Sequence, residues 1–476
     1  MIEHNQIHEQ YSDQPEQREV AALIKRARRA QAILETYSQA QIDRLITAMV
    51  WSCCRPGVAE ELAQFTVDET QLGDYDGKYK KIALKTRAAL MDILDDKSVG
   101  VIEEDKVRNI IKIAKPVGVI GALSPSTNPE ATPVIKAINA VKARNAIIIA
   151  PHPRAKLTNK KIIDNMRSAL TMMSAPEDLV IGIETPTLPK TNELMRQADL
   201  VWATGGPDMV RAAYSSGTPA LGVGAGNAVI TVDETANIFD AAEKIRISKT
   251  LDLAASCSAD NSVLAVATIY DALLAQLIEQ GGYAAQAGDY EKIAAVLWQD
   301  GQLNPNAVVL KPQVLCDMAG VDIPADRQFI IMPETGVGPN NLYSGEKLSA
   351  IVALYKVANI DEAIELTNRI QAYQGMGHSC GIYSNNDDNI LKLASATKTA
   401  RVMVNQPQAP SNSGNLWNGM RQTFSLGCGT WGGTSTTENI NWRHLVNVTW
   451  VSKPLPVPKV LPDDSVLFAS VIEKFN

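Results

Sequence analysis

Cys257 is the residue of this sequence best suited to covalent chemistry. It lies in LAASCSADNSVLAV, where small neighbours such as Ser256 leave room for a substrate beside the sulfur. A thiolate attacks carbonyl carbons and forms thioesters. The other cysteines are scattered, with neither a CxxC pair nor a zinc-binding spacing, so we predict no metal site. A lone cysteine is more often a buried structural thiol, and the neighbouring motifs must decide between the two roles.

Two other segments offer groups that bind negative charge. Asn128 follows a predicted strand in SPSTNPEATP, where its amide donates to a developing oxyanion or caps the helix that begins there. In ATGGPDM, Thr204, Gly205 and Gly206 lie between a predicted strand and a helix. Backbone amides at such a turn bind a pyrophosphate, although the segment lacks the full GxGxxG pattern and also fits a plain tight turn.

Hydrophobic periodicity predicts the elements that position these groups. Apolar residues at helical spacing from Arg18 to Leu94 predict several amphipathic helices. Short Val- and Ile-rich runs then alternate with helical stretches, once up to DLVWATGG and again from NAVITVD to ARVMVN. This alternation predicts two α/β units with parallel sheets. The closing HLVNVTWVSKP predicts a strand, and the Pro-rich stretch after it predicts a tail that reaches another subunit.

Length and charge limit the class of protein. The 476 residues are enough for two domains, and the net charge of −7 comes without a basic run. We therefore expect small molecules and further copies of the chain as partners, and no nucleic acid. The N-terminus lacks a cationic leader, and no run reaches the roughly 18 apolar residues that span a bilayer. We expect a soluble cytoplasmic protein with reduced thiols, not associated with a membrane.

Together these segments resemble the aldehyde dehydrogenase superfamily, and within it the CoA-acylating branch that acts on acetaldehyde, succinate semialdehyde and sulfoacetaldehyde. The resemblance covers roughly Ala21 to Lys453. Its most specific blocks are KARNAIIIAPHPRAK, ATGGPDMVRAAYSSGTPALGVGAGN, SCSADNSV, GMGHSCGIYS and LGCGTWGGTSTTENI. It implies an α/β fold with a Rossmann-like cofactor domain, an α/β catalytic domain and a β arm that mediates oligomerisation.

The resemblance also implies boundaries along the chain. Residues 1–228 would form the helical N-terminal region and the NAD(P)-binding domain, and residues 229–404 the catalytic domain. Residues 405–476 would return to the cofactor domain and end in the arm. The arm would consist of residues 107–115 and 444–453 and would join the chain into a homodimer or homotetramer.

Individual roles follow from the same resemblance. Cys257 would be the nucleophile, and Asn128 with the Cys257 backbone amide would form the oxyanion hole. The implied cofactor-binding residues are Pro151, His152, Pro153 and Arg154 at the adenosine, Thr204, Gly205 and Gly206 at the pyrophosphate, Glu346 at the nicotinamide ribose, and His378. His378, in GMGHSCG, would assist deprotonation of CoA or contact its phosphates, with a surface histidine as the alternative. Arg154 and Lys156 suit a 2′-phosphate, but relatives with either cofactor have basic residues there, so NAD and NADP both stay open.

The implied reaction ends in acyl transfer to CoA. Hydrolytic relatives carry a glutamate that activates water in the segment matching LGVGAGN, and this chain has Gly222 there. Without that base, the thioester on Cys257 would wait for the thiol of CoA, the co-substrate. The alternatives are a hydrolytic aldehyde dehydrogenase and a non-catalytic relative.

The substrate pocket differs from that of the acylating relatives. Ser256 replaces a larger apolar residue ahead of the nucleophile, and Arg421 in LWNGMRQTF lies near a segment that borders the aldehyde tunnel in related enzymes. A guanidinium there would bind a carboxylate or sulfonate, and a solvated arginine is the alternative. We therefore expect a short anionic aldehyde, sulfoacetaldehyde or succinate semialdehyde, with acetaldehyde or propionaldehyde as the other option.

Overall fold

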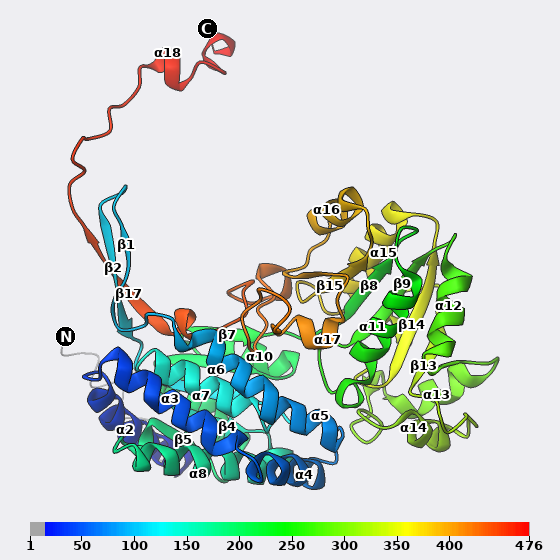
Figure 1. Cartoon of the computed structure of the whole chain (residues 1–476), viewed down its shortest axis with the longest axis horizontal. Coiled ribbons are helices and arrows are strands. Elements are labelled where there is room, and N and C mark those ends of the chain that lie inside the picture. Colours follow the sequence, from blue (N-terminus) through cyan, green and yellow to red (C-terminus); the bar gives the residue numbers. More distant parts are fainter. Residues whose placement is uncertain (1–14, 476) are drawn as a thin grey trace.

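The computed structural model describes residues 15–475 and has two lobes, with an arm that rises from one of them (Figure 1). The expected α/β fold class, with two separate parallel sheets, is confirmed. The expected first domain begins with residues 1–14, and the expectation that the chain lacks a leader also concerns them. These residues lie outside the described part of the chain. Within residues 15–475, no helix is both long and apolar enough to cross a membrane.

The N-terminal helices pack against the first lobe. Each buries one stripe of side chains, as Val20, Ile24 and Ala27 do at three- and four-residue spacing. These helices are α2 (Pro15–Leu34), α3 (Gln39–Cys54), α4 (Val58–Thr70), α5 (Tyr75–Lys80), a π-helical turn (Lys81–Lys85) and α6 (Thr86–Leu94). The expected helical region is therefore present.

A five-stranded parallel sheet forms the centre of the first lobe, in the order β5-β4-β3-β6-β7. Its strands are β3 (Val119–Ser124), β4 (Ala146–Pro151), β5 (Val180–Gly182), β6 (Leu200–Thr204) and β7 (Ala220–Val223). Its helices are α7 (Thr132–Lys142), α8 (Lys156–Met172), α9 (Leu188–Gln197) and α10 (Pro207–Tyr214). Every residue of β3 and β4 is buried, as expected of strands between two helical layers. The strand order reverses between β3 and β6, where open α/β sheets bind ligands.

A seven-stranded parallel sheet forms the second lobe, in the order β10-β13-β14-β9-β8-β15-β16. Its strands are β8 (Ala228–Val232), β9 (Asp260–Val266), β10 (Gly282–Ala284), β13 (Phe329–Pro333), β14 (Ile351–Val357), β15 (Cys380–Tyr383) and β16 (Val402–Val404). The helices are α11 (Ile238–Thr250), α12 (Tyr270–Glu279), α13 (Asp289–Leu297), α14 (Pro312–Ala319), α15 (Ile360–Tyr373), α16 (Asp387–Ala396) and α17 (Gln408–Ser411), with a small hairpin of β11 (Trp298–Gln299) and β12 (Gln302–Leu303). The boundaries at 228 and 404 stay predictions.

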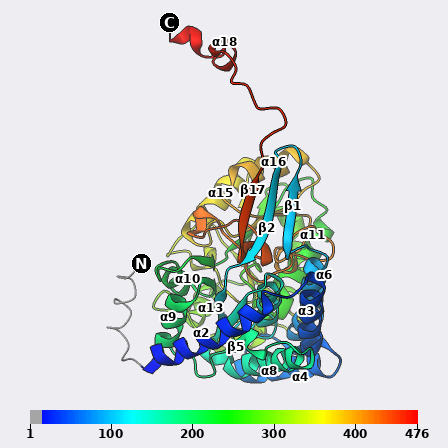
Figure 2. The ribbon, with the colours of Figure 1, turned by 90° about the vertical axis from the view of Figure 1, so that its left-hand side faces the viewer.

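The arm is a three-stranded antiparallel sheet in the order β1-β2-β17, seen face-on in Figure 2. Its strands are β1 (Gly100–Asp105), β2 (Ile110–Pro116) and β17 (Val446–Ser452). The expected segments 107–115 and 444–453 supply β2 and β17, which pair along their whole length. Strand β1 is an addition that the sequence analysis missed. Beyond β17 the chain extends away from both lobes to the short helix α18 (Asp464–Leu467).

Candidate active site

Cys257 and His378 come together at the junction of the lobes. Cys257 lies just before β9, and His378 lies two residues before β15, which β8 separates from β9 in the same sheet. The His378 Nε2 atom is 3.2 Å from Cys257 Sγ, and its Nδ1 atom is 2.9 Å from Ser379 Oγ. The structure therefore places His378 at the expected nucleophile, and it does not line the pocket that contains the expected adenosine and pyrophosphate residues.

Burial keeps both members of this pair neutral. Burial raises the pKa of the Cys257 thiol to about 12, and the nearby Glu346 charge adds to that rise. Burial also lowers the pKa of His378 to about 3, with a further contribution from Arg401. A neutral imidazole with so low a pKa is a weak base, so His378 can accept the thiol proton only as the sulfur attacks and the thiol becomes more acidic.

A left-handed turn positions the nucleophile. The three successive residues of the turn Asp252–Ala254 have φ angles of 50°, 53° and 63°. Side chains avoid this region because Cβ approaches the following carbonyl oxygen. Such a turn persists only where surrounding contacts fix it.

Those contacts come from the N-terminal helices. The Asp252 carboxylate accepts a hydrogen bond from Lys78 Nζ at 2.8 Å and another from Lys81 Nζ, all within a buried cluster. Gly77 on α5 permits the approach, since a Cβ there would come within 2.5 Å of Asp252 Cβ. Glu130 lies 4.0 Å from Lys78 and completes a group of two cations and two carboxylates.

The Asn128 side chain does not cap the helix that follows it, and its amide oxygen has no hydrogen-bond donor among the described residues. The following helix α7 starts at Thr132, and no side chain caps it. The Asn128 amide donates to Thr127 Oγ1 at 3.2 Å, and its Oδ1 is buried without a partner among the described residues. Asn128 lines the same pocket as Ser256, the residue before the nucleophile. Only the second N–H of its amide can donate to an oxyanion there, since the unpartnered Oδ1 is an acceptor, and this role stays a prediction.

Replacing Asn128 by alanine should lower kcat by about 10²- to 10³-fold with little change in KM, because one oxyanion donor is lost. Steady-state kinetics would measure the loss. The rate of Cys257 alkylation by iodoacetamide should stay at the parent value, since the thiol and His378 are untouched. A kcat close to that of the parent enzyme would contradict the assignment of Asn128 to the oxyanion hole.

A first pocket, of about 320 Å³, opens at the carboxyl ends of β3, β4 and β6, where the strand order reverses. It is lined by the expected residues Pro151, His152, Pro153, Thr204, Gly205 and Gly206, together with Leu123, Ser124, Pro125, Ala150, Pro186, Thr187, Leu188, Thr191 and Met209. Helix α10 begins directly after Gly206, where a Cβ would meet no atom within 4 Å. An open helix N-terminus beside an apolar wall fits the pyrophosphate and adenosine of a dinucleotide.

Three of the expected cofactor residues, Arg154, Glu346 and the His378 described above, lie outside this lining. The Arg154 side chain is partly buried, and its guanidinium donates to the Pro305 carbonyl at 3.4 Å. Glu346 lies close enough to Cys257 for its charge to act on the thiol, and burial raises the Glu346 pKa to about 8. Their contact with the cofactor stays a prediction.

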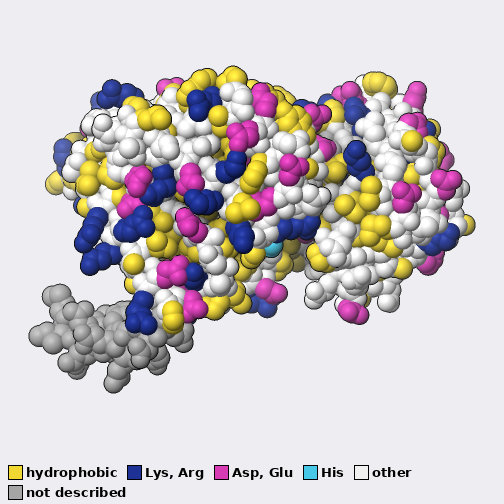
Figure 3. Space-filling model, turned by 90° about the horizontal axis from the view of Figure 1, so that it is seen from below, with side chains coloured by type: hydrophobic (Ala, Val, Ile, Leu, Met, Phe, Trp, Pro, Cys, Tyr) yellow, Lys and Arg dark blue, Asp and Glu magenta, His cyan; other side chains and the backbone are white. Residues whose placement is uncertain are grey.

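A second pocket, of about 390 Å³, contains both Asn128 and Ser256. It is lined by Lys80, Lys81, Leu84, Lys85, Ala88, Asn128, Leu251, Ser256, Ala409, Pro410, Ser413, Asn415, Leu416, Trp417, Gln422 and Phe424. The expected Ser256 is among these residues, and three lysines that the sequence analysis missed are as well. Their signal in the sequence was the lysine-rich segment KYKKIALK, which the expectation of no basic run overlooked. Figure 3 shows basic side chains where the two lobes meet.

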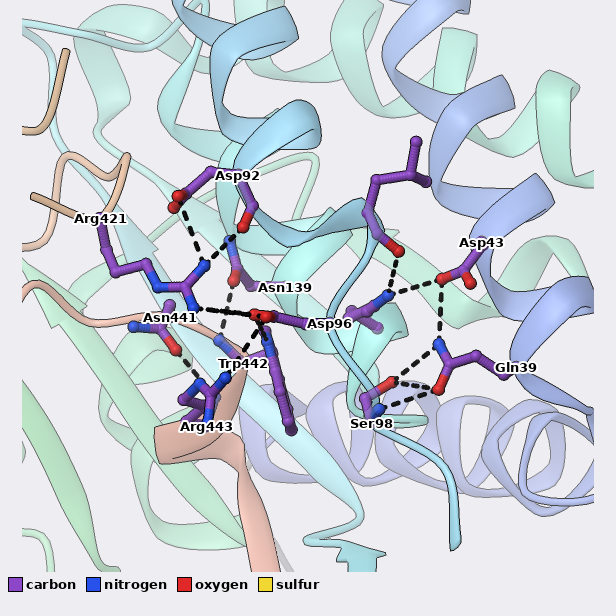
Figure 4. Close-up of polar contacts among 12 residues, drawn as sticks. Gln39, Asp43, Asp92, Asp96, Ser98, Asn139, Arg421, Asn441, Trp442 and Arg443 are labelled. Carbon is purple, nitrogen blue, oxygen red and sulfur yellow. Dashed lines mark hydrogen bonds and ion pairs between the residues drawn. The ribbon is translucent and has the colours of Figure 1, made fainter. Parts of the chain in front are cut away.

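The expectation that Arg421 faces the substrate is corrected by its ion pairs. Its guanidinium lies 3.3 Å from Asp92 Oδ1 and 3.2 Å from Asp96 Oδ2, and it also donates to the Asp92 carbonyl (Figure 4). Arg443 and the indole of Trp442 share Asp96. Two carboxylates on or next to α6 thus satisfy Arg421, which does not line the second pocket.

The fold and the site define a thiol-dependent oxidoreductase with a dinucleotide-binding sheet. The chain belongs to the aldehyde dehydrogenase family, whose model matches residues 5–292 and 339–443. This confirms the family seen in the sequence.

Individual relatives cover nearly the whole chain. A protein named sulfoacetaldehyde dehydrogenase from an Acholeplasma species is 41% identical, over 95% of this chain and 94% of that protein. The succinate-semialdehyde dehydrogenase (acetylating) of Clostridium kluyveri is 38% identical, over 92% of this chain and 97% of that protein. The crystal structure of an acetylating aldehyde dehydrogenase from Geobacillus thermoglucosidasius matches with a TM-score of 0.90 and 35% identity, over 94% of this chain and 98% of that one.

Proposed function

We propose that the chain is a CoA-acylating aldehyde dehydrogenase that oxidises a short anionic aldehyde with NAD(P)+ and transfers the acyl group from Cys257 to CoA. The names of its relatives, which include sulfoacetaldehyde and succinate-semialdehyde dehydrogenases, support the substrate class. The single observation that carries the proposal is the 3.2 Å contact between His378 and the thiol of Cys257. Run in reverse, the same site reduces an acyl-CoA to the aldehyde.

The residues of the site divide the chemistry among them. Cys257 attacks the aldehyde carbon while His378 Nε2 accepts the thiol proton, and the Asn128 amide with the Cys257 backbone N–H stabilises the oxyanion. A bound nicotinamide dinucleotide supplies the hydride acceptor. The acyl group then resides on Cys257 as a thioester. After His378 has released its proton, the neutral imidazole is again able to accept one, now from the thiol of CoA.

A side chain at Gly222, where hydrolytic relatives would carry the water-activating carboxylate, would clash with α10. A Cβ there would lie 2.7 Å from both Tyr214 Cε2 and Val210 Cγ1, and the Gly222 backbone N–H donates to the Tyr214 hydroxyl at 2.9 Å. Glu346, the acid whose charge acts on Cys257, has its pKa raised to about 8 and is mostly protonated at pH 7. A protonated carboxyl group is no general base, so thiolysis is favoured over hydrolysis.

Reduction of NAD(P)+ at pH 7 should depend strictly on CoA. The experiment compares acetaldehyde, propionaldehyde, succinate semialdehyde and sulfoacetaldehyde, each with and without CoA, and identifies the product by mass. We expect acyl-CoA and a preference for the anionic aldehydes. Any turnover without CoA should appear only above about pH 8, where Glu346 becomes ionised. Free acid formed rapidly at pH 7 without CoA would overturn acyl transfer, and a preference for acetaldehyde would overturn the anionic substrate.

We also propose that the protein is a cytoplasmic homodimer or homotetramer assembled through the arm. The edge strand β17 carries an exposed Trp450, with 57% of its surface accessible, on a sheet that extends beyond the lobes. Strand edges of this kind pair with other chains. All six cysteines are free thiols, which suits a reducing compartment.

A further inference from the structure

We propose that Lys85 forms an anion subsite in the second pocket and that its ammonium group binds the sulfonate or carboxylate of the aldehyde. This inference rests on the proposed function and names the residue that recognises the charge of the substrate.

Lys85 occupies the last position of the π-helical turn between α5 and α6. Such turns are rare in proteins, and many of those that occur lie at functional sites. The extra residue redirects the side chains that follow it. Lys85 lines the pocket that also contains Asn128 and Ser256. An aldehyde with its carbonyl group at Asn128 would therefore extend into the space that Lys85 borders.

The charge of Lys85 is not compensated by the protein. Its Nζ donates to the Ser413 carbonyl at 2.7 Å, to Gln422 Oε1 at 2.6 Å and to the Gly414 carbonyl, and all three acceptors are neutral. These bonds use all three N–H groups of the ammonium, so a bound anion would replace one of the neutral acceptors. Within residues 15–475 it forms no ion pair. Lys81, in the same turn, is instead paired with Asp252.

The surroundings of Lys85 favour an anionic ligand. The pocket lining, as far as residues 15–475 supply it, contains no aspartate or glutamate. Among the described residues, Asp92 is the only acid whose charge acts on Lys85, and it is already paired with Arg421. Burial lowers the pKa of Lys85 to about 7, so the charged form lacks stabilisation that an anion would supply.

Arg421, which does not line the second pocket, contributes to this arrangement indirectly. Asp92, which Arg421 binds, accepts a hydrogen bond from the Gln422 backbone N–H at 3.0 Å. The Gln422 side chain in turn holds Lys85. Arg421 is therefore a positioning residue for the loop that borders the subsite.

Exchanging Lys85 for methionine tests the proposal, since this substitution removes the charge and keeps an unbranched side chain that is only one atom shorter. We expect kcat/KM for sulfoacetaldehyde and succinate semialdehyde to fall about 10- to 100-fold, mainly through KM. For propionaldehyde the value should stay close to that of the parent. Lys85→Arg should restore most of the anion preference. The control Lys25→Met, on an exposed position of α2, should match the parent with every substrate.

The outcomes separate the two proposals. A parent enzyme without CoA-dependent turnover of any aldehyde overturns the proposed function. A parent enzyme that works, combined with equal losses for all substrates in Lys85→Met, overturns the subsite, because Lys85 would then only hold the loop at Ser413 and Gln422. A parent preference for neutral aldehydes overturns it as well.

Inhibition of the parent enzyme keeps the proposal testable if Lys85→Met does not fold. Ethanesulfonate should compete with the aldehyde, and its uncharged analogue ethyl methyl sulfone should bind about tenfold more weakly or worse. Equal inhibition by the two compounds would overturn the subsite.

Discussion

Replacing Cys257 by alanine should abolish formation of acyl-CoA, with a loss in kcat of about 10⁴-fold or more, because removing a covalent nucleophile leaves only binding and the oxyanion donors. The loss is measured by NAD(P)H formation in the presence of CoA. Mass spectrometry of the protein after incubation with aldehyde and NAD(P)+, but without CoA, should show an acyl adduct on the parent enzyme and none on the variant.

The buried thiol of Cys316 on α14 provides the matched control. Cys316→Ala should keep both the turnover and the adduct, because this side chain lies in the core of the second lobe, apart from the site. An adduct that disappears with Cys316, or that persists in Cys257→Ala, would assign the nucleophile elsewhere.

His378→Gln should slow thioester formation at pH 7 by about 10²- to 10⁴-fold, because the thiol then lacks a neutral proton acceptor. The pH dependence has a definite sign. In the parent, the pKa of His378 is held at about 3, so the acceptor is present throughout the neutral range and the rate should be nearly flat above pH 5. In the variant, reaction requires free thiolate of Cys257, whose pKa is about 12. The rate should then rise about tenfold per pH unit between pH 7 and 10.

Single-turnover kinetics from pH 6 to 10 would record both profiles. Glutamine retains a hydrogen-bonding side chain, so we expect the variant to fold. Its circular dichroism spectrum and its binding of the dinucleotide would show whether it has folded. A flat profile in His378→Gln would mean that another group accepts the proton, and the 3.2 Å contact would then be structural.

Much of the fold could be predicted because its signals are local. Val- and Ile-rich runs separated by helical periods mark the strands of both sheets, and β3 and β4 are buried along their whole length, as their composition indicates. Asn128 and the turn at Thr204 follow two adjacent strands of the first sheet, and Cys257 precedes a strand of the second. The motifs therefore singled out these residues, and their roles stay predictions.

The substrate end of the site could not be predicted because it depends on side-chain direction and on partners far away in the sequence. Arg421 is drawn to Asp92, which precedes it by 329 residues, and nothing in LWNGMRQTF reveals that pairing. Lys85 lies in a basic segment that has the pattern of an ordinary amphipathic helix, and a π-helical turn leaves no pattern in a single sequence. The contact of His378 with the sulfur also required the fold, since 121 residues separate the two.

The left-handed turn before the nucleophile has a consequence for the order in which the protein matures. Its three residues cost about 1–2 kcal/mol each in that conformation, and the compensating contacts come from Lys78 and Lys81, more than 170 residues earlier. The described residues of the second lobe pack against the turn but supply no partner for the Asp252 carboxylate. We therefore expect the thiol to reach its working position only after α5 has docked, so that a folding chain has no reactive cysteine until both lobes are assembled.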